Sequence, residues 1–246
     1  MTPVPINFLD WWAHGLISSF TGAGFLLVNQ HFKLRASTLL LWRGFGVSLM
    51  YLPLAMLVPW PTNPVFYLAT VFMGVLAFFF DRLCIESSAR FGAGVTSRLL
   101  PLGVWLTFFV YLLIDPDHAQ HLIMQPGKTA GIISALVVAV CAMFFIRKDA
   151  VSKQAIKFLA PAIIMSGVVY LMNKIVMDAS PNPLSGAFVY GLIMSFVVGV
   201  VTVINRKFFE EKRIEFSQAF HRGVFRGGLL LTMLIVIGVI NKNIAM

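Results

Sequence analysis

Charged residues lie inside several long apolar stretches of this sequence, where a charge is costly and marks a candidate functional position. Arg43 and Arg98 each come about six residues after the start of their stretch, and Asp81 comes four or five residues before the end of its own. At about 1.5 Å per helical residue, the charges lie at similar depths, roughly 9 Å in. With Asn29, near the end of the first stretch, they are predicted to form one polar cluster.

This cluster has a specific chemistry. A carboxylate such as that of Asp81 accepts the forked donors of a buried arginine, so we expect Arg43 and Asp81 to interact. Two arginines against one aspartate leave surplus positive charge, which favours an anionic or zwitterionic solute. Structural roles remain open: an arginine at this depth can extend to the lipid headgroups, and Asp81 can simply end a helix beside Arg82. The spacing of Arg82 and Glu86 predicts an ordinary surface pair.

A second group of candidates lies in the later part of the chain. Asn173 and Lys174 come near the far end of their stretch, and Tyr190 lies within the next one. We consider all three as solute-binding residues. Alternatively, Lys174 extends to the membrane surface near Asp178, and Tyr190 packs against neighbouring helices.

The polar segment Asp115–His121 contains two carboxylates and two imidazoles, which suggests a divalent metal site as an alternative. Polar loops of this composition are common, and we predict neither a metal site nor a cofactor. The Gly-x-Gly sequences follow no predicted strand, so they do not indicate a phosphate-binding loop.

Composition defines the elements that must hold these residues. The chain has 246 residues, of which 59% are apolar and 12% charged, with a net charge of +9. A soluble domain has about a quarter charged residues. A soluble enzyme, a disordered chain and a nucleic-acid-binding protein are thereby excluded. We predict an all-α polytopic membrane protein.

Eight apolar stretches have the length of a membrane-spanning helix. They cover residues 12–30, 37–58, 64–85, 92–114, 129–146, 158–177, 183–204 and 223–241. Fourteen of the 19 lysines and arginines fall in or beside the first, third, fifth and seventh connections. By the positive-inside rule, these connections are cytoplasmic and both termini lie outside. No basic N-terminal region indicates a cleaved signal peptide.

A weak internal repeat relates the first and sixth stretches, TGAGFLLVNQ and MSGVVYLMNK, each with an asparagine near its end. Five helices separate the copies, so the repeats are inverted in the membrane, as in many secondary transporters. We predict a first repeat of five helices over residues 1–152 and a second, incomplete repeat of three helices over 153–246.

Three segments carry a family resemblance: TLLLWRGFGVSLMYLPLA with Arg43, GAGVTSRLLPLGVWLTFFVYLL with Pro101, and TAGIISALVVAVCAMFFI. In this order they resemble the second, fourth and fifth helices of the drug/metabolite transporter superfamily, specifically its EamA-type exporters of ten helices. Arg98, the long fourth connection and the absence of helices nine and ten depart from the family pattern.

The resemblance implies a secondary exporter of small metabolites, such as amino acids, nucleotide sugars or drug-like solutes, that works by alternating access. We expect the protein in a bacterial inner membrane, where its partners are the lipid bilayer and a small-molecule substrate. Whether two copies form a homodimer is left open. Two alternatives are a membrane-embedded metal-dependent enzyme that uses Asp115–His121 and an incomplete, non-transporting membrane partner.

Overall fold

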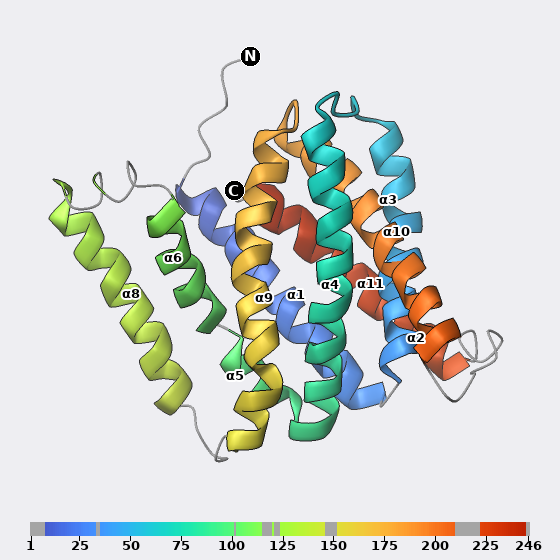
Figure 1. Cartoon of the computed structure of the whole chain (residues 1–246), viewed down its shortest axis with the longest axis horizontal. Coiled ribbons are helices and arrows are strands. Elements are labelled where there is room, and N and C mark those ends of the chain that lie inside the picture. The colour runs from blue at the N-terminus through green and yellow to red at the C-terminus, as the bar shows by residue number, and fades with distance from the viewer. Residues whose placement is uncertain are drawn as a thin grey trace.

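The computed structural model describes residues 8–32, 35–100, 102–114, 120, 124–145, 152–209 and 222–244. Every element within these ranges is a helix. In Figure 1 most helices run side by side as one bundle, as expected for a chain in which long apolar segments alternate with short polar ones. The all-helical, membrane-like class predicted from composition is confirmed.

Within the described ranges, five helical segments are long and apolar enough to cross a membrane: Ala36–Met56, Pro64–Phe91, Lys153–Asp178, Pro183–Phe208 and Gly223–Asn241. They correspond to five of the eight predicted spans. The other three predicted spans fall in α1 (Phe8–Phe32), in α5 (Ala93–Leu99) with α6 (Leu102–Ile114), and in α8 (Pro126–Phe145). The total of eight spans remains a prediction.

The second predicted span is one continuous helical segment with a wide turn in it. It consists of α2 (Ala36–Leu41), the π-helical turn η1 (Trp42–Gly46) and α3 (Val47–Met56). The third span, α4 (Pro64–Phe91), begins at an asparagine cap, where the Asn63 side chain accepts a 3.0 Å hydrogen bond from the Val65 amide. Proline at the first helical position suits this start. The helix continues six residues beyond the predicted end at 85.

The predicted span over residues 92–114 is divided into α5 and α6. It begins at Gly92, whose φ of +89° is a backbone conformation that favours glycine and that lets the chain turn sharply after α4. The sequence places a proline at position 101, between the two helices, and proline has no amide hydrogen to donate to the helical hydrogen-bond ladder. That α5 and α6 together form the predicted span remains a prediction.

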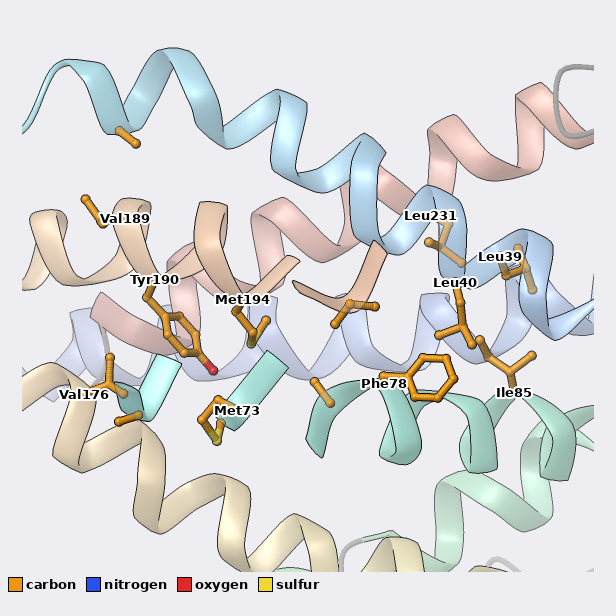
Figure 2. Packing of buried hydrophobic residues seen from close by; sticks show 14 of the residues in the cluster. Leu39, Leu40, Met73, Phe78, Ile85, Val176, Val189, Tyr190, Met194 and Leu231 are labelled. Atoms are coloured by element: carbon orange, nitrogen blue, oxygen red, sulfur yellow. The ribbon is translucent and has the colours of Figure 1, made fainter. Parts of the chain in front are cut away.

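Three helix pairs form the body of the bundle. The helix α1 packs along α11 (Arg222–Ile244), α4 packs along α9 (Lys153–Asp178), and the segment from α2 to α3 packs along α10 (Pro183–Phe209). The largest core cluster lies between α2, α3, α4, α9, α10 and α11, and includes the buried Leu40, Met73, Phe78 and Leu231 (Figure 2). This core fixes the positions of the central helices.

Glycines permit the closest approach in the core. A Cβ atom on Gly44 would clash with the backbone of Gly199, so η1 and α10 cross almost in backbone contact. Small residues allow membrane helices to approach in this way. The approach brings the residue next to Gly44, Arg43, against α10.

Towards one side of the bundle, α6 packs on α9, whereas α8 lies at the edge (Figure 1). Most of the described side chains of α8 are exposed, including Ile132, Ile133 and Val138. An apolar helix with such exposure fits a lipid environment.

Candidate functional site

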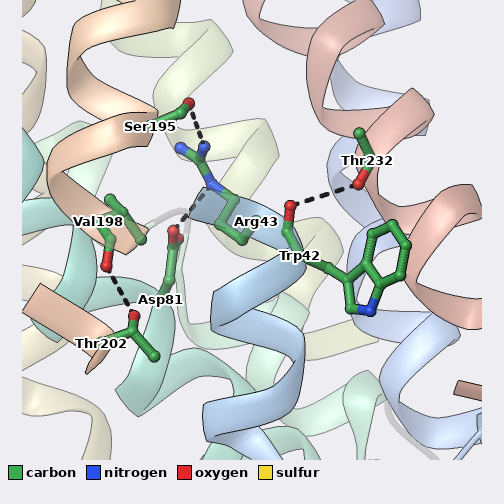
Figure 3. Close-up of polar contacts among 7 residues, drawn as sticks. All are labelled: Trp42, Arg43, Asp81, Ser195, Val198, Thr202 and Thr232. Atoms are coloured by element: carbon green, nitrogen blue, oxygen red, sulfur yellow. Dashed lines mark hydrogen bonds and ion pairs between the residues drawn. The ribbon is translucent and has the colours of Figure 1, made fainter. Parts of the chain in front are cut away.

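An ion pair is buried at the crossing of α4, α10 and η1. The Nε atom of Arg43 donates to Oδ2 of Asp81 at 3.1 Å, and its Nη1 atom donates to the Ser195 hydroxyl at 2.9 Å (Figure 3). Arg43 is only 6% exposed and Asp81 only 9%. The predicted contact between Arg43 and Asp81 is confirmed, and this burial argues against an arginine that extends to the headgroups.

The π-helical turn explains how Arg43 is placed. A π turn widens the helix locally, and such turns are frequent at functional sites. Here it carries Arg43 towards α4 and α10, while the Trp42 carbonyl accepts a 3.4 Å hydrogen bond from the Thr232 hydroxyl of α11 (Figure 3). Contacts to three other helices therefore position the turn that carries the guanidinium group.

Burial makes the two charges dependent on each other. Removing one partner of a buried ion pair typically costs about 3–5 kcal/mol, because the other charge is left uncompensated. A pair of well-packed apolar residues would often be no less stable. Stability alone is therefore a weak reason for an ion pair at this position, and a functional role is favoured.

The ion pair lies at the wall of a cavity of about 520 Å³. The cavity is bounded by α1, α4, α9 and α11, with η1 and the end of α5 completing it. Its apolar wall includes Phe25, Leu26, Phe80, Val169, Leu234 and Ile235, and its hydroxyl groups include Ser18, Ser19, Thr21, Ser97 and Ser166. A mostly apolar wall with a few polar groups, in this volume range, is typical of a small-molecule site.

Arg43 and Asp81 retain capacity for a solute. Arginine has five N–H donors, and two of those of Arg43 are used by Asp81 and Ser195. Among the described residues, the Oδ1 atom of Asp81 has no hydrogen-bond donor. The pair therefore offers both donors and an acceptor at one point of the cavity wall.

The expected four-residue cluster is only partly formed. Arg98 lies on α5 and lines neither cavity described here, although its neighbour Ser97 lines the large one. Its Nη1 atom is buried and finds no hydrogen-bond partner in the described part of the chain. Adjacent helical side chains point about 100° apart, so the one that faces the cavity is Ser97. Arg98 therefore does not line the cavity with Arg43 and Asp81, and its role in solute binding remains a prediction. The Asn29 side chain lies outside the described structure.

Of the later candidates, Tyr190 lies close enough to Arg43 and Asp81 to interact with them electrostatically. Asn173 is buried and Lys174 is exposed on α9, and neither lines a cavity described here. Tyr190 is 4% exposed and packs in the core near Met73 and Met194 (Figure 2), as its alternative interpretation predicted. The roles of all three in solute binding remain predictions.

Two polar contacts were not expected from the sequence. Ser195 lies in the apolar run MSFVVG, where a lone serine gives no signal of a partner 152 residues away. The second contact involves His14. Its Nδ1 atom lies 2.6 Å from the Asn241 Oδ1 atom, which joins α1 to α11. The Asn241 amide also donates to the Ile237 carbonyl, and this fixes its orientation.

The predicted pair of Arg82 and Glu86 is confirmed, with Nε and Oε1 2.8 Å apart. It does more than cover the surface, because Arg82 Nη1 also donates to Asn205 Oδ1 at 3.0 Å and connects α4 with α10. Of the segment Asp115–His121, which is only an alternative metal site, Gln120 alone is described. No cluster of three or more metal-ligating side chains occurs among the described residues.

No family model, curated protein or solved structure matches this chain. The fold itself defines an all-helical protein with candidate membrane-spanning helices and a buried ion pair at the wall of a cavity.

Proposed function

We propose that this protein is a secondary transporter that moves small amphipathic or zwitterionic metabolites by alternating access. The observation that carries the proposal is the cavity of about 520 Å³ among candidate membrane-spanning helices, with Arg43 and Asp81 at its wall. Intramembrane ionisable residues in such positions typically mark a solute or ion pathway.

The chemistry of the wall suggests how a solute is held. A carboxylate or phosphate oxygen on the solute accepts hydrogen bonds from the free donors of Arg43, and a solute cation faces Asp81. The apolar part packs against Phe25 and Phe80, and hydroxyl groups such as that of Thr21 bind its remaining polar atoms. Amino acids and small drug-like compounds have this combination of groups.

The helix pairs support an inverted-repeat arrangement. In an inverted repeat, the first, second and third predicted spans correspond to the sixth, seventh and eighth. Helix α1 then corresponds to α9, and α11 corresponds to α4, so a contact between α1 and α11 requires an equivalent contact between α9 and α4. Both pairs are packed along each other in the structure. The second and seventh spans correspond to each other and also form a pair.

Two glycine contacts support the same correspondence at residue level. Gly44 is the ninth residue from Ala36, and it faces Gly199, the seventeenth from Pro183. Gly191 is the ninth residue from Pro183, and a Cβ there would lie 2.6 Å from the ring of Tyr51, the sixteenth from Ala36. The two contacts therefore occupy equivalent positions on the two helices, to within one residue. If the two repeats rock against each other about this crossing, the cavity opens to either side of the membrane.

The proposal is tested by exchange of labelled solutes in liposomes that contain the purified protein. A panel of amino acids, nucleotide sugars and hydrophobic amines is loaded inside, and uptake of each labelled compound is measured without ATP. We expect at least one zwitterionic or amphipathic compound to exchange faster than in protein-free liposomes and to saturate with concentration. No saturable exchange of any compound in the panel would favour the non-transporting membrane partner.

A further inference from the structure

A second cavity of about 270 Å³ lies at the opposite side of α4 from the first and shares no lining residue with it. It is formed where the start of α2 meets α4 and the last turns of α10. Its lining residues are Arg35, Ala36, Ser37, Leu40, Phe78, Arg82, Glu86, Thr202 and Asn205. The transport mechanism proposed above does not use this cavity.

Positive charge exceeds negative charge around this cavity. Arg82 lies 2.8 Å and Arg90 lies 3.8 Å from the carboxylate of Glu86, and Arg35 belongs to no ion pair within the described ranges. Arg82 and Arg90 thus share one carboxylate and Arg35 adds a third positive charge, so positive charge exceeds negative charge by two among these four residues. Because Arg90 also lies 5.0 Å over the Phe158 ring, the groups left to face the cavity are Arg35 and Arg82.

Arg82 is held in place, whereas Arg35 is adaptable. Bonds to Glu86 and Asn205 occupy the Nε and Nη1 atoms of Arg82, which leaves its Nη2 amino group available. Arg35 is exposed at the mouth of the cavity, and Ser37 is buried in its wall. Leu40 and Phe78 are fully buried and make an apolar floor. An anion would therefore sit at the mouth, between the two arginines.

We propose that this cavity binds a phosphate group. Arginine forks match the geometry of phosphate oxygens, and a serine hydroxyl supplies a further donor. The cavity opens where α2 begins and α4 approaches its end, the depth at which a membrane protein meets phospholipid headgroups. The phosphate belongs either to such a headgroup or to a soluble phosphate compound, and the two sources are separated by experiment.

The test compares the unfolding midpoint of the purified protein in detergent micelles after addition of phosphatidylglycerol, of diacylglycerol with the same acyl chains, or of inorganic phosphate. Lys153→Gln serves as the control variant, because Lys153 is an exposed basic residue at another helix start. A ligand that binds only the folded state raises the midpoint.

We expect phosphatidylglycerol to raise the midpoint by several degrees more than diacylglycerol in the wild type and in Lys153→Gln. This difference should be lost in Arg35→Gln and in Arg82→Gln. Arg35→Gln removes no contact between described residues, so it separates loss of binding from loss of folding. A comparable stabilisation by inorganic phosphate, lost in the same variants, would identify a soluble phosphate compound as the ligand. Equal responses in wild type and both arginine variants would overturn the proposal.

Discussion

Arg43 and Asp81, which are 38 residues apart in the sequence, form a 3.1 Å ion pair at the wall of the largest described cavity. Each comes from a different candidate membrane-spanning segment, and Ser195 of a third segment completes the arrangement. One polar centre therefore joins three helices of the bundle. The predictions below follow from this relationship and from the helix contacts around it.

The first prediction concerns the energy of the ion pair. Asp81→Asn and Arg43→Gln should each lower the free energy of unfolding by about 3–5 kcal/mol, because each leaves a buried charge without its partner. The double variant should lose less than the sum of the two. Unfolding in detergent micelles, analysed as a double-mutant cycle, measures the coupling.

The partly exposed pair of Arg82 and Glu86 provides the control for this cycle. Arg82 is 36% exposed in this pair, and partly exposed pairs of this kind contribute about 0–1 kcal/mol. A coupling between Arg43 and Asp81 no larger than that between Arg82 and Glu86 would show that the buried contact is energetically unimportant.

The second prediction concerns the crossing of η1 and α10. Gly44→Ala should destabilise the protein by about 1–3 kcal/mol, because the added methyl group meets the backbone of Gly199 and the helices must separate. Gly131→Ala in α8 is the matched control, since nothing lies within 4 Å of a Cβ there. It should stabilise its helix by roughly 0.5–1 kcal/mol. Equal thermal stability of the two variants would refute the close approach.

The third prediction concerns the contact between α1 and α11. The hydrogen bond between His14 and Asn241 should give a coupling energy of about 1 kcal/mol in a cycle of His14→Ala and Asn241→Ala. The two residues lie one turn from the cavity-lining Ser18 and Gly238, so the variants should also increase the reactivity of the cavity thiol of Cys84. Cys141→Ala provides a background without the other cysteine. An unchanged labelling rate of Cys84 in these variants would show that the contact between α1 and α11 does not help to close the cavity.

The fourth prediction concerns orientation. The distribution of basic residues places the segments around Lys148 and Lys212 in the cytoplasm and the segment around Lys128 outside. Reporter domains fused after each residue should give these three locations. The reverse pattern at all three would invert the topology.

Much of this arrangement follows from patterns within single segments. Apolar runs of 18 to 23 residues predict the helices, and the charges of Arg43 and Asp81 at similar depth predict their pairing. Both signals are local or depend only on distance from a helix end. The pairing of Arg82 with Glu86 follows in the same way from their spacing along one helix.

Other features depend on how helices rotate and cross, which depth alone does not specify. Arg98 has the right depth but lies on a short helix that directs Ser97 to the cavity. The bonds of Ser195 to Arg43 and of His14 to Asn241 join segments more than 150 residues apart. Gly44 and Gly199 meet because both lack a side chain. Their helices contain several other glycines that do not meet, so the sequence alone does not indicate which glycines form the crossing.

The most direct test of the central claim is solute exchange by Asp81→Asn and Glu86→Gln in matched liposomes, with a compound that the wild type carries. Asp81→Asn keeps the shape of the side chain but removes its charge, so a transporter that binds its solute at the Arg43–Asp81 pair should lose most of its exchange rate or require far more solute for half-saturation. Glu86 lines the smaller cavity and not the cavity with Arg43 and Asp81, so Glu86→Gln should exchange at nearly the wild-type rate. Wild-type kinetics in Asp81→Asn, at equal amounts of folded protein, would contradict the assignment of this cavity as the solute site.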